Sequence, residues 1–168
     1  LSKVARSRQK SNRVGNKGAA TLTASSYRSK YETEVASNFT TSGISFDYES
    51  CPFKYLDPIV KGICVDCGCK NVAQMRTYTP DFALKNALGA VVFFVETKGL
   101  FTAENRRTLL LMQKQHPLKD IRMLFMRNNK LHKSNPKTYG DWCDSNGIKW
   151  AVGKELPTNW KEELDGSS

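Results

Sequence analysis

The sequence predicts a mixed α/β domain in which helices flank a sheet. The stretch "AVVFFVETK" at residues 90–98 is an apolar run of β-branched and aromatic residues, which is typical of a buried strand. Segments with helical spacing alternate with short strand patterns along the rest of the chain, and this alternation favours helices layered on a sheet. With 168 residues the chain is long enough for one domain with its own core.

Residues 1–24 are predicted to form a flexible basic arm, because they lack hydrophobic periodicity. From residue 1 to residue 31 the chain carries eight basic side chains and no acid. Such a segment is either a solvated tail or an arm that becomes ordered on phosphate, and we favour the arm. Its candidate DNA contacts are Arg6, Arg8, Lys10, Arg13 and Arg28.

The main domain is expected over residues 25–156, and it begins with a helix and a strand. A helix is predicted over "SSYRSKYETEVASNF", with Ser25 or Ser26 as its N-cap. Its apolar stripe consists of Tyr27, Tyr31, Val35 and Phe39. Gly43 is expected to end the helix, and "ISFDY" then alternates as a strand should.

A cysteine-bearing insertion and a hairpin follow. Residues 51–76 read as an irregular bridge. "DFAL" and "AVVFFVETK" are predicted to be hairpin strands, because Asn86 and Gly89 supply turn chemistry between them.

The remaining elements alternate between helix and strand. The patterns predict a helix in "AENRRTLLLMQKQ", a strand in "DIRMLFM", a short helix in "TYGDWCDSNG" and a last strand in "IKWAV". Residues 157–168 are expected to be a C-terminal tail.

The charge points to a polyanionic partner. The chain has 26 Lys and Arg against 16 Asp and Glu, a formal charge of +10. Nucleic acid is favoured over a membrane surface, because no amphipathic apolar anchor accompanies the charge. No apolar stretch is long enough to cross a bilayer and no signal-peptide pattern opens the chain, so we expect an intracellular protein.

Acids stand out against this basic background at Asp81 and Glu96, with a lysine at Lys98. Residues two apart on a strand share a face, so Glu96 and Lys98 point the same way. The pattern fits either a surface ion pair or a phosphodiesterase site. In the second case the carboxylates hold Mg²⁺ and the lysine orients the attacking water or offsets developing charge.

Further basic residues are candidates for contacts with the DNA backbone. Arg106 and Arg107 begin a helix beside the expected site, although a solvated helix face is nearly as good an interpretation. "RNNKLHKSNPK" reads as a basic loop, with Lys130 and Lys133 as its phosphate contacts.

The cysteines of the insertion follow the pattern C-x12-C-x2-C-x-C. Cys51, Cys64, Cys67 and Cys69 could complete a structural zinc site. Reduced free thiols and disulfides are the alternatives, and an intracellular chain argues against disulfides. Cys143 is expected to be a buried apolar residue.

Several blocks resemble the phage endonuclease I family, the Holliday-junction resolvases of the PD-(D/E)XK nuclease superfamily. These blocks are "TYTPDF…FFVETKGL", "YRSKYETEVASNFTTSGISFDYE", "RRTLLLMQKQHP", "DIRMLF" and "NPKTYGDWCDSNGIKWA". The resemblance implies a segment-swapped homodimer that cuts branched double-stranded DNA with Mg²⁺ or Mn²⁺. The family has a shorter connection without cysteines where this chain has its insertion.

The resemblance also implies roles for particular residues. Asp81, Glu96 and Lys98 would form the metal and catalytic core. Glu32 would be an additional carboxylate and metal ligand, contributed by the partner chain. By pattern alone, Glu32 borders the apolar stripe of its helix, a position that is more often occupied by a solvated residue. Two further positions match: Thr97 would lend its backbone carbonyl to the metal, and Asp47 stands where the family has a supporting glutamate.

The sequence therefore predicts an endonuclease that resolves four-way and other branched junctions. Another DNA nuclease of the same fold, sequence-specific or for repair, is the nearer alternative. A non-catalytic, zinc-stapled DNA-binding protein is the alternative from another class. If the chain is phage-encoded, we expect it in the host cytoplasm.

Overall fold

The computed structural model describes residues 27–58 and 73–166. The basic arm, both expected N-cap serines and three of the insertion's cysteines (Cys64, Cys67 and Cys69) lie outside these ranges. The helices are α1 (Lys30–Thr41), α2 (Ala103–Gln115), α3 (Tyr139–Ser145) and α4 (Thr158–Asp165). The strands are β1 (Ser45–Tyr48), β2 (Phe53–Pro58), β3 (Ala73–Tyr78), β4 (Phe82–Lys85), β5 (Val91–Lys98), β6 (Ile121–Phe125), β7 (Lys130–His132), β8 (Asn135–Thr138) and β9 (Trp150–Val152).

A mixed five-stranded sheet forms the centre of the molecule, in the order β1-β4-β5-β6-β9. β1, β4 and β5 pair antiparallel, whereas β5, β6 and β9 run parallel. The α/β class expected from the sequence is thus confirmed. The hairpin β4–β5 places the residues just before β4 beside the end of β5, and α2 provides the crossover from β5 to β6.

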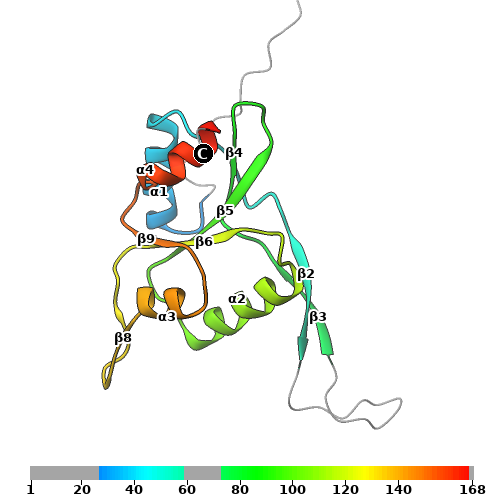
Figure 1. Ribbon diagram of the computed structural model, residues 1–168, viewed down its shortest axis with the longest axis vertical. Coiled ribbons are helices and arrows are strands. Elements are labelled where there is room, and N and C mark those ends of the chain that lie inside the picture. Colours follow the sequence, from blue (N-terminus) through cyan, green and yellow to red (C-terminus); the bar gives the residue numbers. More distant parts are fainter. Residues whose placement is uncertain (1–26, 59–72, 167–168) are drawn as a thin grey trace, which may run out of the picture.

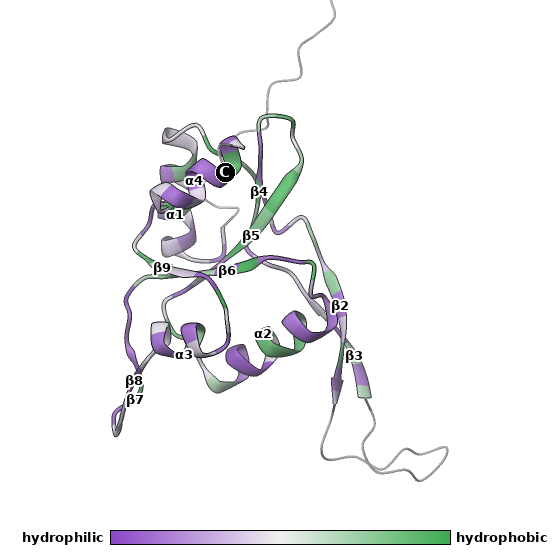
Figure 2. Cartoon of the chain, viewed as in Figure 1, coloured by the Kyte–Doolittle hydropathy of each residue, from purple (hydrophilic) through white to green (hydrophobic). Residues whose placement is uncertain are grey.

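Helices cover both faces of the sheet (Figure 1). α1 and α4 pack on one face over a core that includes Phe93 and Val95, whereas α2 and α3 pack on the other over a core that includes Phe94. Successive side chains of β5 therefore point alternately into the two cores, which explains why the strand is a continuous apolar run. Figure 2 shows β5 as a largely hydrophobic strand and the β7–β8 hairpin as mostly hydrophilic.

α1 begins later than expected, which corrects the predicted cap. Its N-cap is Ser29, whose hydroxyl accepts a hydrogen bond from the backbone N–H of Glu32 at 3.1 Å. The serine hydroxyl also donates to the Glu32 carboxylate at 2.8 Å, so the sequence S-x-x-E forms a local capping interaction. In the sequence, no acid stands three positions after Ser25 or Ser26. Tyr27 precedes the helix and packs against the core from there.

Three segments expected to lack structure contain regular elements. β2 and β3 pair antiparallel over six positions, from Phe53↔Tyr78 to Pro58↔Ala73, and all but the last two residues of β3 lie within the segment 51–76 that was predicted to be irregular. The basic segment 127–137 forms most of the β7–β8 hairpin. The expected tail contains α4, whose Trp160 and Leu164 lie one helical turn apart and are both buried.

Other expectations are confirmed. α2 spans the predicted helix, the β4–β5 turn carries Gly89 at φ +79°, and Cys143 is fully buried. Within residues 27–58 and 73–166, no helix has the length and apolar character needed to cross a bilayer.

Candidate active site

Asp81 is fixed at the start of β4 by the strand beside it. Its carboxylate is almost fully buried, with 1% of the residue exposed. Oδ2 accepts two hydrogen bonds from Thr97, one from the backbone N–H and one from the hydroxyl, each at 2.7 Å. Thr97 thus positions Asp81 through its N–H and side chain, a contribution that the sequence did not reveal. The expected carbonyl contact to a metal stays a prediction.

Glu96 and Lys98 lie at the end of β5 and point to the same face, as the alternation predicted. Glu96 Oε1 pairs with Lys98 Nζ at 2.5 Å, and Glu96 Oε2 accepts a hydrogen bond from the Tyr78 hydroxyl at 2.9 Å. Glu96 is 7% exposed, so these partners replace water around the carboxylate. Tyr78, at the end of β3, was not among the residues singled out from the sequence.

The site has more negative charge than its own cations neutralise. Burial and the nearby charge of Asp81 raise the pKa of Glu96 to about 7, although Lys98 and Tyr78 act in the opposite direction. Burial disfavours the charged form of Lys98, but Glu96 and Asp81 outweigh it and raise the lysine pKa. Two buried carboxylates with this mutual repulsion form an environment in which an added divalent cation is favourable.

Glu32 lies at the N-terminus of α1 and is held by hydrogen bonds. It accepts from the Tyr48 hydroxyl at 2.5 Å, from the Ser29 hydroxyl at 2.8 Å and from the Arg28 backbone N–H at 3.1 Å. Glu32 is only 9% exposed, so it is not the solvated flank that its place beside the stripe suggested. Its helix packs on the sheet of its own chain.

Arg28 and Glu49 connect the α1 side to Asp81. The Nη2 atom of Arg28 pairs with Glu49 and lies 3.5 Å from Asp81 Oδ1. Glu49 follows β1, and its backbone N–H donates to the Asp81 carbonyl at 2.9 Å. Arg28 was expected to contact DNA, whereas Glu49 was missed because nothing in the local pattern marks a residue that contacts a strand more than thirty positions away.

Asp47 stands apart from the other acids in this structure. Its carboxylate pairs with Lys85 at 2.6 Å, and its side chain is 42% exposed. Within residues 27–58 and 73–166, no hydrogen bond or ion pair joins Asp47 to Asp81, Glu96 or Glu32, and no three His, Cys, Asp or Glu residues converge closely enough to hold a metal. Asp81 and Glu96 are therefore the central pair.

Glu96 of the central pair borders a solvent-open cleft of about 240 Å³. The cleft lies between the end of β5, the end of β3 and the side of α2 that carries Asn105 and Thr108, and it is open to solvent at Glu96 and Lys98. Its polar lining includes Arg28, Thr77, Glu96, Lys98, Asn105 and Thr108.

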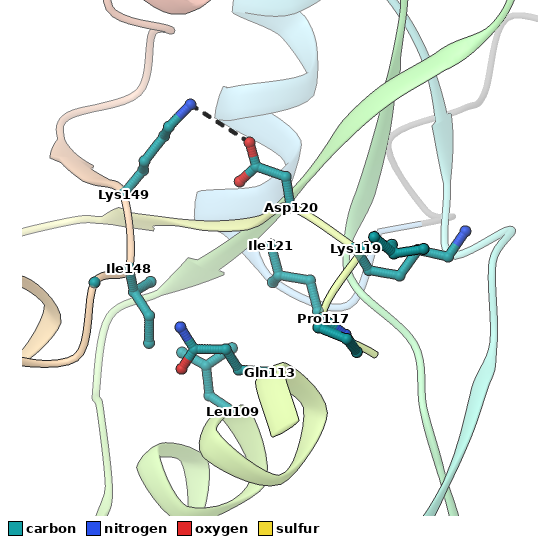
Figure 3. A pocket seen from close by; sticks show the side chains of 10 residues that line it. Leu109, Gln113, Pro117, Lys119, Asp120, Ile121, Ile148 and Lys149 are labelled. Atoms are coloured by element: carbon teal, nitrogen blue, oxygen red, sulfur yellow. Dashed lines mark hydrogen bonds and ion pairs between the residues drawn. The ribbon is translucent and has the colours of Figure 1, made fainter. Parts of the chain in front are cut away.

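A cavity of similar size, about 260 Å³, lies on the other side of Leu109 (Figure 3). Its acid is Asp120, which pairs with Lys149 at 3.5 Å, as the dashed line shows. Because the walls of this cavity are largely apolar, such as Ile121 and Ile148, and the buried pair Asp81–Glu96 lies outside its lining, we assign the chemistry to the cleft beside Glu96.

The candidate DNA contacts of the described part differ in their surroundings. Arg107 pairs with Asp57 of β2, and this pair ties α2 to the β2–β3 ribbon. Arg106 donates to the Phe101 carbonyl at 2.7 Å and lines an open groove with Lys130 and Lys133. Arg107 thus has a structural partner, whereas the other three residues share a basic groove. Phe101 lines both this groove and the cleft.

Cys51 is the one member of the expected zinc set that falls in the described ranges. It is partly buried and packs against the core under α2 and α3. Its zinc role stays a prediction.

Comparisons with known proteins match this chain to one family. The family model "Phage endonuclease I" matches residues 14–167. Endonuclease I of Escherichia phage T7 is 38% identical over 138 residues, which cover 82% of this chain and 79% of the relative. Endodeoxyribonuclease 1 of Enterobacteria phage T3 is 36% identical over 126 residues, covering 74% and 70%. The chain belongs to the phage endonuclease I family.

Proposed function

We propose that this protein is an endodeoxyribonuclease that resolves four-way and other branched DNA junctions by metal-dependent hydrolysis. The observation that carries the proposal is the buried Asp81–Glu96 pair with Lys98, in which Glu96 and Lys98 line a cleft, in a chain of this family. Relatives named endonuclease and endodeoxyribonuclease support the reaction and the substrate polymer. The charge of +10 supports binding to a polyanion.

The donor set at the site fits Mg²⁺ or Mn²⁺, because it consists of carboxylate oxygens. A cation bound there would stabilise charge on the phosphate and lower the pKa of a bound water. Thr97 holds Asp81 in place by two hydrogen bonds, so this ligand is preorganised. Lys98, paired with Glu96 at the cleft, would orient the attacking water and offset negative charge on the phosphate.

Resolving a junction requires cuts in two strands, so we further propose that the protein acts as a homodimer with two sites. Each site would have the PD-(D/E)XK arrangement, with Glu32 as an additional carboxylate. Arg106, Lys130 and Lys133 line a groove next to the cleft, and they would contact the DNA backbone there. Arg28, at the cleft itself, and Arg6, Arg8, Lys10 and Arg13 of the arm complete the proposed contacts.

Two proposals concern other parts of the chain. A structural zinc on Cys51, Cys64, Cys67 and Cys69 would stiffen the insertion, and metal analysis of the purified protein would test it. The family relatives are phage proteins, so the host cytoplasm is the proposed location.

The test is cleavage of a synthetic four-way junction against a linear duplex with the same arms, in Mg²⁺ or in EDTA. We expect paired, metal-dependent nicks on the junction, a loss in Lys98→Ala and normal cleavage in the matched control Lys149→Ala. Equal cutting of both substrates would refute the junction selectivity. Junction binding without cutting in either Mg²⁺ or Mn²⁺ would refute the nuclease and leave a DNA-binding protein.

A further inference from the structure

One nitrogen atom of Arg28 lies at the meeting point of two acids. Its Nη2 pairs with Glu49 Oε1 and lies 3.5 Å from Asp81 Oδ1. These two carboxylates come from different strands, since Glu49 follows β1 and Asp81 precedes β4. A single positive group therefore sits where two oxygen ligands converge, which is the position that a divalent cation would also favour.

The guanidinium of Arg28 offsets the cost of removing the Glu49 carboxylate from water. The residue adopts φ +46°, a conformation that costs a residue with a side chain free energy, and its N–H donates to the Asp81 carbonyl. Its Oε1 atom is buried and accepts no hydrogen bond within the described residues. The ion pair with Arg28 is thus the described interaction that offsets the desolvation of this oxygen.

The main chain of Arg28 is held by hydrogen bonds, whereas its side chain is largely exposed. The backbone N–H donates to Glu32 and to the Tyr48 hydroxyl, each at 3.1 Å. The side chain is 64% exposed and lines the cleft. The guanidinium can therefore leave Asp81 without disturbing the start of α1.

A guanidinium and a divalent cation cannot both occupy the space beside Asp81 Oδ1, because like charges repel at such short range. We infer that Arg28 is an internal counter-ion that competes with the divalent cation for Asp81, and that Glu49 draws the guanidinium aside when the cation binds. Released from Asp81, Arg28 remains at the cleft, where it is placed to pair with a substrate phosphate. Arg28 and Glu49 are positioning residues in this arrangement, and the inference rests on the proposed metal-dependent function.

The two residues are expected to affect metal affinity in opposite directions. Arg28→Gln removes the competitor and should tighten metal binding about fivefold, the scale of one partly exposed ion pair. Glu49→Gln leaves Arg28 with Asp81 as its remaining acidic partner and should weaken binding by a similar factor. Because Glu49 acts through Arg28, the effect of Glu49→Gln should shrink in the Arg28→Gln background.

The experiment is a calorimetric titration of the full-length, metal-free protein with Mn²⁺ alone, in the absence of DNA. Arg106→Gln is the matched control, because it removes the same charge from a neighbouring groove without touching the acids. Circular dichroism of each variant checks the fold. The opposite-sign variant Glu49→Gln keeps the test decisive if Arg28→Gln folds poorly.

Tighter Mn²⁺ binding in Arg28→Gln but not in Arg106→Gln, with reduced coupling in the double variant, would support the inference. Equal effects of the two arginine variants, or weaker binding in Arg28→Gln, would overturn it. A wild-type protein that neither binds Mn²⁺ nor cuts a junction would instead refute the proposed function. Wild-type binding and cutting with no gain in Arg28→Gln would refute the inference alone.

Discussion

Two clusters of buried charge stand against the central sheet, and they differ in how fully their charges are balanced. In one cluster Arg122, 1% exposed, stacks 3.7 Å from the ring centre of Phe93 and pairs with Asp120 and Glu163. Lys149 adds a second cation to the same two acids. Two acids thus meet two cations, and a packed aromatic environment surrounds the arginine.

The other cluster borders a cleft and has one acid in excess, because Asp81, Glu96 and Glu49 meet two cations, Lys98 and Arg28. The pKa shifts of the two glutamates show the contrast. The hydrogen bond from Arg122 lowers the pKa of Glu163 despite partial burial, whereas burial and Asp81 raise that of Glu96 to about 7. A cluster in which acids and cations are equal in number stabilises the fold, whereas an excess of acids at a cleft favours the binding of a cationic ligand. The comparison therefore separates a structural cluster from a functional one.

The largest expected effect is on catalysis. Asp81→Asn keeps the size of the side chain but removes the negative charge that Thr97 orients. We expect single-turnover junction cleavage to fall about a thousandfold, on the scale of losing a preorganised electrostatic group, with the unfolding curve little changed. Cleavage near the wild-type rate would mean that the acid excess at the cleft has no catalytic role.

Arg122→Ala should give the reverse pattern. Removing the guanidinium leaves Lys149 as the cation that Asp120 and Glu163 share, and it opens space beside Phe93 and Trp160. The expected loss is about 3–5 kcal/mol in the free energy of unfolding by urea. Cleavage by the fraction that remains folded should stay normal. A selective loss of cleavage without destabilisation would contradict the structural assignment of this cluster.

The pKa of Glu96 makes the stability of the metal-free protein depend on pH. The pKa rises from 4.5 to about 7 on folding, so the folded protein binds more protons between these values. Stability should therefore fall as the pH rises from about 4.5 through 7, and level off above it. In EDTA, the stability of Glu96→Gln relative to wild type should be higher at pH 8 than at pH 5, by about 2–3 kcal/mol. A difference that does not change with pH would show that Glu96 titrates normally.

The sequence predicted the elements whose side chains enter a core. β5 and α2 were found because apolar spacing records burial on each face of the sheet. β3 was missed, since its residues are exposed almost throughout and carry no alternation. α4 was missed because charged residues surround its two buried positions. Exposed ribbons gain their stability from backbone pairing, which leaves little trace in a single sequence.

The site shows the same division. Asp81, Glu96 and Lys98 were identified because strand pairing and two-residue alternation bring them together. The Tyr78 and Arg28 contacts depend on the geometry of strand ends and of the chain before α1, which no spacing rule encodes.

The smallest effect is expected at Asp47. The family resemblance implies a supporting role for this residue at the active site, whereas the structure pairs it with Lys85 away from the other acids. Its carboxylate is partly exposed and pairs with Lys85 outside the described acid cluster. Asp47→Asn should therefore change junction cleavage by less than about threefold and the free energy of unfolding by at most about 1 kcal/mol. Lys85→Gln, which breaks the same pair from the other side, is the matched control. A large loss of cleavage in Asp47→Asn alone would show that this acid turns toward the site when DNA or metal binds, and the functional cluster would then extend to β1.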